Sequence, residues 1–296
     1  GGKTVNIIKA LLMGLIQGVT EFLPVSSSGH LAIFKQVLGI NLDSGVYFDV
    51  MLHLGTLVAV IIVFREDIWG MIREFWGMLV TIFANFLVFI VRRRGNTEYK
   101  YFKVINSSYR KLVLMVIIST IPTGILGMVG SDLIEKASGT LWVVGMCLIL
   151  TAVLLLLADK HPDGTMRIKD APYSSAFILG IAQGIATMPG LSRSGTTIAT
   201  GLMLGYNKKL AVKYSFIMSI PAILGAVVVK IGSFKNEAFG SANLPGYILG
   251  TIVAGVTGYF SIKYMLKLIK TKRYFGFAIY CAVLGIVAIV FSIVKR

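Results

Sequence analysis

Apolar runs separated by short polar segments fill the chain and predict its helices. Six runs approach the roughly 20 residues that a helix needs to cross a hydrocarbon core. These predicted spans are Val46–Phe64, Leu112–Gly130, Leu141–Ala158, Tyr214–Ile231, Gly246–Ile262 and Phe275–Val294. Two apolar runs too short to span, Ile7–Ile16 and Leu31–Ile40, flank the polar stretch Gln17–His30. Because polar backbone at membrane depth must be buried by protein or line a wet cavity, this pattern predicts a re-entrant hairpin carrying a functional site.

The polar stretch recurs once, at an offset of 166 residues, where Gln183–Thr196 aligns with Gln17–His30. The first copy carries the carboxylate Glu21 and the imidazole His30, whereas the second carries the guanidinium Arg193. We therefore expect one membrane domain, 1–296, built from two related halves at 5–160 and 173–294.

Basic residues predict how these halves are oriented. The segment Arg65–Lys111 holds nine basic and four acidic side chains, and two further basic clusters lie at Lys208–Lys213 and Lys263–Arg273. The positive-inside rule places all three in the cytoplasm if the apolar run Gly77–Val91 does not cross. We expect that run, together with Arg65–Trp76, to form a lateral or interfacial amphipathic stretch within an insert at about 66–110. Three spans then separate the two polar stretches, which gives the inverted-topology repeat typical of transporters.

Composition agrees with a membrane location. The chain is 56% apolar and only 14% charged, with a mean hydropathy of +0.81, so we expect an all-α integral membrane protein with two re-entrant helical hairpins and about six transmembrane helices. The net charge of +16 is explained by basic cytoplasmic loops and anionic lipids, and no nucleic-acid partner is expected.

The first polar stretch combines groups suited to acid–base, nucleophilic or metal chemistry. Glu21 can ligate a hard divalent cation or act as a base, and Gln17 lies one helical turn earlier on the same face. At least one of Ser26, Ser27 and Ser28 is expected to cap a helix beginning near His30, where hydroxyls and backbone N–H groups face an anion. Beside these serines, His30 is expected to transfer a proton or act as a nucleophile.

The second stretch places Arg193 among hydroxyl groups. An unpaired arginine at membrane depth is costly, so either Glu21 or a phosphate should meet it. Its planar fork suits bidentate phosphate binding, and a helix start near Thr196 adds a positive dipole end. Outside the two stretches, Asp49 and His53 lie four residues apart and are expected to bond each other in a supporting role.

Together the two motifs closely resemble those of the undecaprenyl-diphosphate phosphatase family, also called bacitracin-resistance proteins. The motifs are Gln-x-x-x-Glu with Pro-Val-Ser-Ser-x-Gly-His in the first half and Pro-Gly-x-Ser-Arg-Ser-Gly-x-Thr in the second. The resemblance covers essentially the whole chain. It implies hydrolysis of the C55 polyprenyl diphosphate to the monophosphate carrier of cell-wall synthesis, with a Mg²⁺ or Ca²⁺ cofactor. It also implies a bacterial cytoplasmic membrane location with the active site open to the outer face.

Carried over residue by residue, the resemblance assigns catalytic roles to Glu21, Ser27, His30 and Arg193. It implies substrate binding by further side chains, namely Gln17, Ser26, Ser28, Ser192, Ser194 and Thr197, and metal binding by Glu21 and Gln17. Position 17 departs from the Glu that many members carry, which weakens its role as a metal ligand. The region Trp69–Lys103 is longer than the family core needs.

The mechanism expected is metal-assisted phosphoryl transfer, in which Ser27 attacks the terminal phosphorus and His30 handles the proton. Attack by His30 or by a water molecule is the alternative. The expected partners are the polyprenyl diphosphate, membrane lipids and a second copy in a homodimer. The rival interpretation is a secondary transporter or lipid flippase, since inverted repeats with broken helices are shared with that class.

Overall fold

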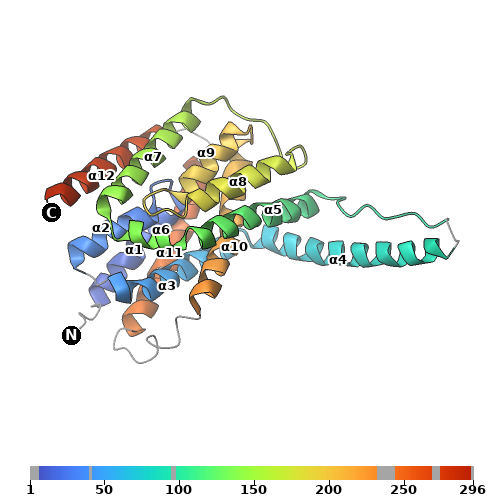
Figure 1. Ribbon diagram of the computed structural model, residues 1–296, viewed down its shortest axis with the longest axis horizontal. Helices are drawn as coiled ribbons and strands as arrows, with labels where there is room; N and C mark the ends of the chain where they lie inside the picture. Colours follow the sequence, from blue (N-terminus) through green and yellow to red (C-terminus); the bar gives the residue numbers. More distant parts are fainter. Residues whose placement is uncertain (1–6, 40–41, 95–97, 232–243, 269–273, 295–296) are drawn as a thin grey trace.

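A computed structural model describes residues 7–39, 42–94, 98–231, 244–268 and 274–294, which form a helical bundle with one long projection (Figure 1). Within these ranges the helices follow in the order α1 (Ile7–Phe22), α2 (Ser27–Leu38), α3 (Leu42–Val63), α4 (Arg65–Arg93), α5 (Ser108–Val129), α6 (Ser131–Ser138), α7 (Leu141–Lys160), α8 (Tyr173–Ile185), α9 (Arg193–Met203), α10 (Lys208–Ile231), α11 (Leu244–Leu268) and α12 (Tyr274–Val294).

Several of these helices are long and apolar enough to cross a membrane, and they make the chain an all-α, multi-pass integral membrane protein. By length and composition the candidates are α4, α5, α7, α10, α11 and α12. Five of the six predicted spans lie in α5, α7, α10, α11 and α12. The sixth, predicted at Val46–Phe64, lies in α3, where Tyr47–Val63 is apolar but shorter than the candidate spans, so α4 takes its place among the six.

The insert contains the expected helix. The run Gly77–Val91 continues Arg65–Trp76 in the single 29-residue α4, which is also long enough to span, so its lateral or interfacial position stays a prediction. Helix continues back to Arg65 because the intervening residues include neither proline nor a turn sequence, and Glu66 and Asp67 favour a helix N-terminus. Figure 1 shows α4 projecting from the bundle, with the chain returning beside it to α5.

The two polar stretches form two short helical hairpins, α1–α2 and α8–α9. The second helices of the hairpins begin at Ser27 and Arg193, which are 166 residues apart. Each hairpin packs through its first helix, since α1 lies against α11 and α8 lies against α5. The inverted orientation of the halves in the bilayer, and their boundaries at 5–160 and 173–294, stay predictions.

Helices α7 and α12 cross at glycines. A Cβ at Gly145 would lie 2.6 Å from the carbonyl oxygen of Gly285, and a Cβ at Gly285 would lie 2.7 Å from that of Gly145. Small residues let helix backbones approach closely where lipid removes most of the hydrophobic drive for association. This close contact fixes α12 beside α7, and α7 in turn supports both hairpins.

Candidate active site

The site forms where the tips of the two hairpins meet. Each tip ends in a serine that caps the following helix: Ser26 Oγ accepts from Gly29 N at 3.2 Å, and Ser192 Oγ accepts from Gly195 N at 3.1 Å. Consequently α2 and α9 begin three residues before the starts predicted near His30 and Thr196. Both positive helix ends therefore lie at the junction, an arrangement that favours an anion.

The serine two residues after each cap, Ser28 or Ser194, ties its tip to the opposite one. Ser28 Oγ accepts from the backbone N–H of Gly190 at 3.2 Å. In the reciprocal contact, Ser194 Oγ donates to the carbonyl oxygen of Leu23 at 3.0 Å. These bonds hold the two tips in register, so residues that are far apart in sequence can form one site.

Glu21 lies at the centre of this junction, and its carboxylate is almost fully buried. Gln17 Nε2 donates to Glu21 Oε2 at 2.9 Å, and Ser27 Oγ donates to the same oxygen. Arg193 Nη2 from the second hairpin donates to Glu21 Oε1 in an ion pair. Three donors, one of them charged, suit an ionised carboxylate in a buried setting. Of the two partners expected for Arg193, the structure shows Glu21.

His53 of α3 completes the surroundings of Glu21. Its Nδ1 lies 2.9 Å from Gln17 Nε2 and 3.4 Å from Glu21 Oε1. Asp49, its expected partner, instead accepts from Lys35 at 2.5 Å. The prediction that Asp49 and His53 bond each other is therefore wrong, because the side chains turn to different helices. Their spacing of four residues placed them on one face but did not identify what faces them.

His30 has a setting of its own. Its Nδ1 lies 2.7 Å from the carbonyl oxygen of Ser26, and its Nε2 lies 2.7 Å from Tyr280 Oη of α12. A carbonyl can only accept, so Nδ1 carries the proton and a neutral ring accepts from the tyrosine at Nε2. Sequence reasoning missed Tyr280, which is one aromatic residue within an apolar span and has no nearby motif.

Accessibility divides the predicted site residues. Ser27, Ser28 and Arg193 are partly exposed at the junction, with about a fifth of the Arg193 side chain open. The others are buried: Gln17, Glu21, Ser26, His30, Ser192, Ser194 and Thr197. Thr197 Oγ1 donates to the carbonyl of Arg193 at 2.8 Å and lies 2.6 Å from Ser215 Oγ. Substrate binding by the buried hydroxyls stays a prediction, and in this structure they support the tips.

The donors available for a metal are few. Among the described residues, no group of three or more His, Cys, Asp or Glu side chains could hold an ion. However, Gln17 Oε1 is buried and is one of the side-chain oxygens in the described part of the chain that lack a hydrogen-bond partner. Magnesium is often bound through one or two carboxylates together with substrate phosphates. Glu21 and Gln17 therefore fit a cation shared with a phosphate ligand, and not a closed protein cage.

Comparison with known proteins gives a consistent result. The family model described as bacitracin resistance protein BacA matches residues 10–287. An undecaprenyl-diphosphatase from Alkaliphilus metalliredigens is 39% identical over 285 residues, covering 96% of this chain and 98% of that protein. One from Methanosphaera stadtmanae is also 39% identical, over 291 residues and 98% and 99% of the two chains. One from Halothermothrix orenii is 35% identical over 287 residues and 97% and 98% of the two chains.

Proposed function

The chain belongs to the family of bacitracin resistance protein BacA, and we propose that the meeting of its hairpin tips is where it hydrolyses undecaprenyl diphosphate. It is a membrane enzyme, an undecaprenyl-diphosphatase, whose products are undecaprenyl phosphate and inorganic phosphate. The observation that carries the assignment of the site is the hydrogen bond from Ser27 Oγ to the buried Glu21 carboxylate, with Arg193 on its other oxygen.

In the proposed first step, Ser27 Oγ attacks the terminal phosphorus. Its proton passes to Glu21, and the bond from that phosphorus to the bridging oxygen breaks. The bonding electron pair leaves with the bridging oxygen on undecaprenyl phosphate. Water then attacks the phosphorus of the phosphoserine, the bond from phosphorus to Ser27 Oγ breaks, and Oγ takes its proton back from Glu21. Inorganic phosphate leaves with the proton of the attacking water, so Ser27 and Glu21 return to their starting states.

Glu21 replaces His30 as the proton acceptor in this scheme. Ser27 already donates to Glu21, whereas both ring nitrogens of His30 face other groups, Ser26 O and Tyr280 Oη. The same contacts favour Ser27 over His30 as the nucleophile. We assign His30 to the support of the first tip, since its bond to Ser26 lies at the cap of α2.

Arg193 and the helix ends bind the diphosphate. One guanidinium nitrogen holds Glu21, and a five-donor group has further N–H groups to offer a phosphate. The N-termini of α2 and α9 add positive dipole ends at the same place, so charge that develops on the phosphate oxygens is stabilised.

Glu21 and Gln17 are the residues that would hold Mg²⁺ or Ca²⁺, together with the substrate's phosphates. When bound, the cation neutralises diphosphate charge. The unpartnered Gln17 Oε1 supports this assignment, and it lets the amide keep its N–H bond to Glu21 while its oxygen faces the ion.

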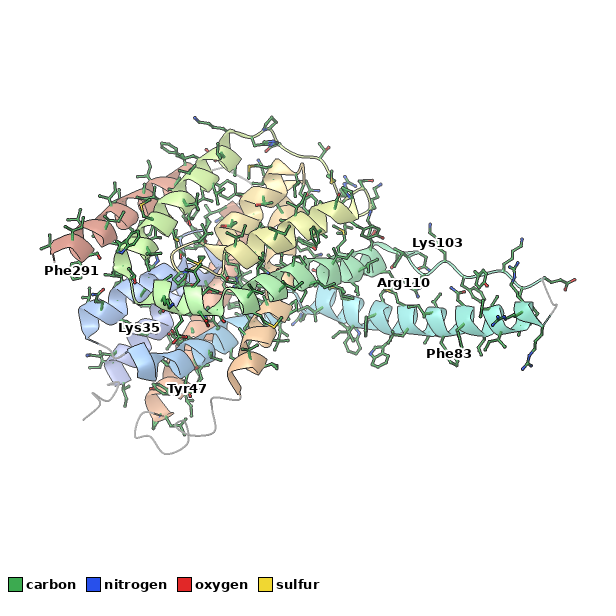
Figure 2. All side chains as sticks on the ribbon, viewed as in Figure 1. Lys35, Tyr47, Phe83, Lys103, Arg110 and Phe291 are labelled. Atoms are coloured by element: carbon green, nitrogen blue, oxygen red, sulfur yellow. The ribbon has the colours of Figure 1, made fainter. Side chains whose placement is uncertain are left out.

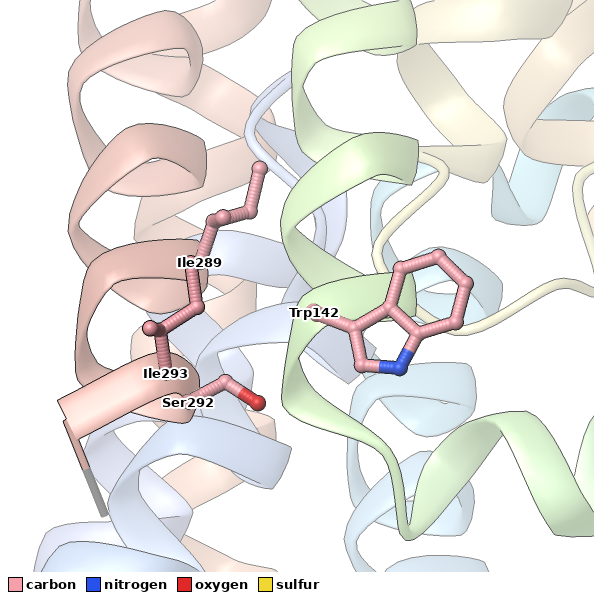
Figure 3. Close-up of a pocket in the computed structure, with 4 residues that line it drawn as sticks. All are labelled: Trp142, Ile289, Ser292 and Ile293. Atoms are coloured by element: carbon pink, nitrogen blue, oxygen red, sulfur yellow. The ribbon is translucent and has the colours of Figure 1, made fainter. Parts of the chain in front are cut away.

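Part of the prenyl tail is proposed to lie between α7 and α12. A cavity of about 300 Å³ there is lined by Trp142, Ile289, Ser292 and Ile293 (Figure 3). Trp142 is two residues before Val144, whose carbonyl oxygen lies against Gly190 of the second tip. This mostly apolar cavity lies on the helix that contacts the second tip, so it is where the tail is placed while the diphosphate reaches Ser27.

The location is proposed to be the cytoplasmic membrane, with the site open to the extracytoplasmic side. The positive-inside rule places the basic segments, which flank α4, α10 and α11, on the cytoplasmic side. The cavity between α7 and α12 lies away from them, near the start of α7 at Leu141. Assembly as a homodimer stays a prediction.

Release of inorganic phosphate from a long-chain prenyl diphosphate by purified protein in detergent tests the function. Detergent removes the two compartments that a transporter needs, so a carrier or flippase shows no turnover. Steady release at catalytic amounts of protein supports the hydrolase. Absence of release under every divalent-ion condition, with protein shown to be monodisperse, would favour the transporter.

A further inference from the structure

The projection formed by α4 and its return segment, which we call the arm (residues 65–94 and 98–107), has no part in the proposed reaction. Its root is fixed to the bundle: Asp67 Oδ1 accepts from Lys213 Nζ at 2.5 Å and from Tyr109 Oη at 2.9 Å. The arm is therefore held at a defined place on the basic side of the protein, beside α5 and α10.

One face of α4 is used to bind the return segment. Asn85 donates to Phe102 O at 2.9 Å and accepts from Phe102 N at 2.7 Å. Nearer the root, Arg110 donates to Glu74, Thr81 and Val104 O at 2.8, 3.1 and 2.8 Å. Toward the far end, Arg92 donates to Tyr99 O at 3.1 Å.

These α4 residues all lie on one side of the helix. Positions 74, 81, 85 and 92 differ by seven, four and seven residues, which at 3.6 residues per turn brings each back to within about 20° of the first. Figure 2 shows Lys103 on the return segment, Arg110 at the root and Phe83 on the opposite side of α4. The polar groups of the arm thus satisfy one another.

The rest of α4 is apolar and open. Trp69, Trp76, Val80, Phe83 and Phe86 are 57–67% exposed, and Phe75–Val91 contains no charged side chain. That charge-free stretch is about 25 Å long at 1.5 Å per residue. Soluble surfaces rarely expose apolar patches of this kind, so something covers it.

The width of the open face indicates what covers it. Each residue advances about 100° around the helix axis. On this scale, the exposed apolar side chains extend from Phe89 through Phe83 to Val91 and cover an arc of about 200° around α4. A protein partner contacts mainly one side of a helix, whereas lipid chains surround every open side. Lipid is therefore the occupant that fits the geometry.

The tip of the arm adds charge of one sign. Between positions 92 and 103 there are five basic residues and one acidic residue. Arg92 Cζ lies 5.4 Å from the Tyr101 ring centre, and Arg93 Cζ lies 5.8 Å from that of Phe89. Guanidinium groups next to aromatic rings at the end of an apolar helix suit the headgroup level of a bilayer, where phosphates attract them.

We propose that the arm is a lipid-binding element: its open face lies among acyl chains of the cytoplasmic leaflet, and its basic tip binds the phosphate groups of anionic lipids. The partner is an anionic phospholipid, and not the diphosphate substrate or a second copy of the chain.

The chain offers a built-in probe, because it has three tryptophans and two of them, Trp69 and Trp76, lie on the open face of the arm. Trp142→Phe in the full-length protein leaves only these two. In lipid nanodiscs, brominated acyl chains are expected to quench most of the fluorescence of these two tryptophans, while aqueous acrylamide quenches little of it. Strong acrylamide quenching would place the arm in water, and weak quenching by both agents would place it under protein; either result overturns the proposal.

Headgroup preference at the tip is read from a second probe, Phe89→Trp in protein whose Trp69, Trp76 and Trp142 are replaced by phenylalanine, because Trp76 lies about 24 Å along α4 from Arg92. In nanodiscs of phosphatidylcholine with a minor fraction of phosphatidylglycerol, only one lipid is brominated at a time, at equal mole fraction. Enrichment of the anionic lipid near the arm by about fivefold is expected, the effect of one basic side chain at a membrane surface. Removing Arg92, Arg93 and Arg94 by alanine substitution should abolish the preference. Equal quenching by the two lipids with the three arginines in place would overturn this part.

A matched control removes the same charge elsewhere on the basic side. Alanine at Lys160, Arg167 and Lys169, which are exposed residues outside the arm, should leave the preference unchanged. If this control loses the preference as fully as the arm variant does, the attraction comes from net charge and not from the tip.

Discussion

The carboxylate of Glu21 and the guanidinium of Arg193 form an ion pair across 172 residues of sequence. Each comes from a different helical hairpin, so neither hairpin can make the site alone. Ser27 donates to the second carboxylate oxygen of Glu21. Glu21 therefore contacts both the nucleophile and the phosphate-binding group of the proposed mechanism.

Arg193→Lys should not behave as a conservative change. Lysine keeps the charge but loses the planar fork that can hold Glu21 and a phosphate together. Loss of one or two charge-assisted bonds, at about 1.5–3 kcal/mol each, predicts a fall in kcat/KM of roughly tenfold to a thousandfold or more. Phosphate-release kinetics measure this, and monodispersity in detergent shows whether the variant is folded. Near-normal turnover of a folded variant would mean that Arg193 only neutralises Glu21.

Chelation should abolish activity, and Mg²⁺ or Ca²⁺ should restore it. The reason is that Glu21 is the only acidic side chain in the two polar stretches, with one open amide oxygen beside it on Gln17. Gln17→Ala should raise the cation concentration that gives half-maximal phosphate release. Full activity in excess chelator would remove the metal from the mechanism.

Tyr280→Phe tests how His30 supports the tip. The change removes the hydroxyl that lies 2.7 Å from His30 Nε2 and keeps the ring that stacks on the imidazole at 5.6 Å between ring centres. One neutral hydrogen bond at about 1 kcal/mol predicts a roughly fivefold loss of kcat/KM if it is needed to orient the imidazole. His30→Ala should cost more, since it also frees Ser26 O. Unchanged turnover in both variants would show that this pair does not affect the site.

Gly190→Ala should destabilise the second tip. Gly190 has φ of +92°, which L-residues rarely adopt, and a Cβ there would collide with the carbonyl of Val144. Strained backbone and overpacking together should lower the free energy of unfolding by about 2–4 kcal/mol, which is measured as a lower Tm in detergent. Gly276→Ala is the control, because a Cβ at that helical position meets nothing within 4 Å. Equal Tm values for the two variants would argue against tight packing of the tip.

Much of the fold and part of the site could be predicted from the sequence, because membrane helices appear in it as long apolar runs. The repeat at 166 residues located both hairpins, and the motif residues Glu21, Ser27 and Arg193 do meet. The sequence could not give their pairing, since a lone arginine among hydroxyls fits a carboxylate as well as it fits a phosphate. The structure shows Arg193 on Glu21 through one nitrogen, and the other N–H groups of the guanidinium can still meet a phosphate.

Other features depended on contacts between distant elements. Tyr280 and His53 reach the hairpins from α12 and α3, and a single polar residue in an apolar span does not reveal what it faces. The arm was expected as an amphipathic stretch from Arg65 to Val91, and α4 is one unbroken helix over those residues, but the pairing of its polar face with the return segment could not be predicted. The helix starts were placed late because Ser26 and Ser192 cap one turn earlier than expected.

The most direct test of the account is the rate of phosphate release by Ser27→Ala. The proposed mechanism needs the Ser27 hydroxyl as nucleophile, so its removal should lower kcat by at least about a thousandfold, as for other covalent nucleophiles. Ser138→Ala is the control, because that exposed hydroxyl in α6 donates only to its own helix, at Glu135 O, and it should turn over normally. A folded Ser27→Ala protein that releases phosphate at the wild-type rate would contradict the account.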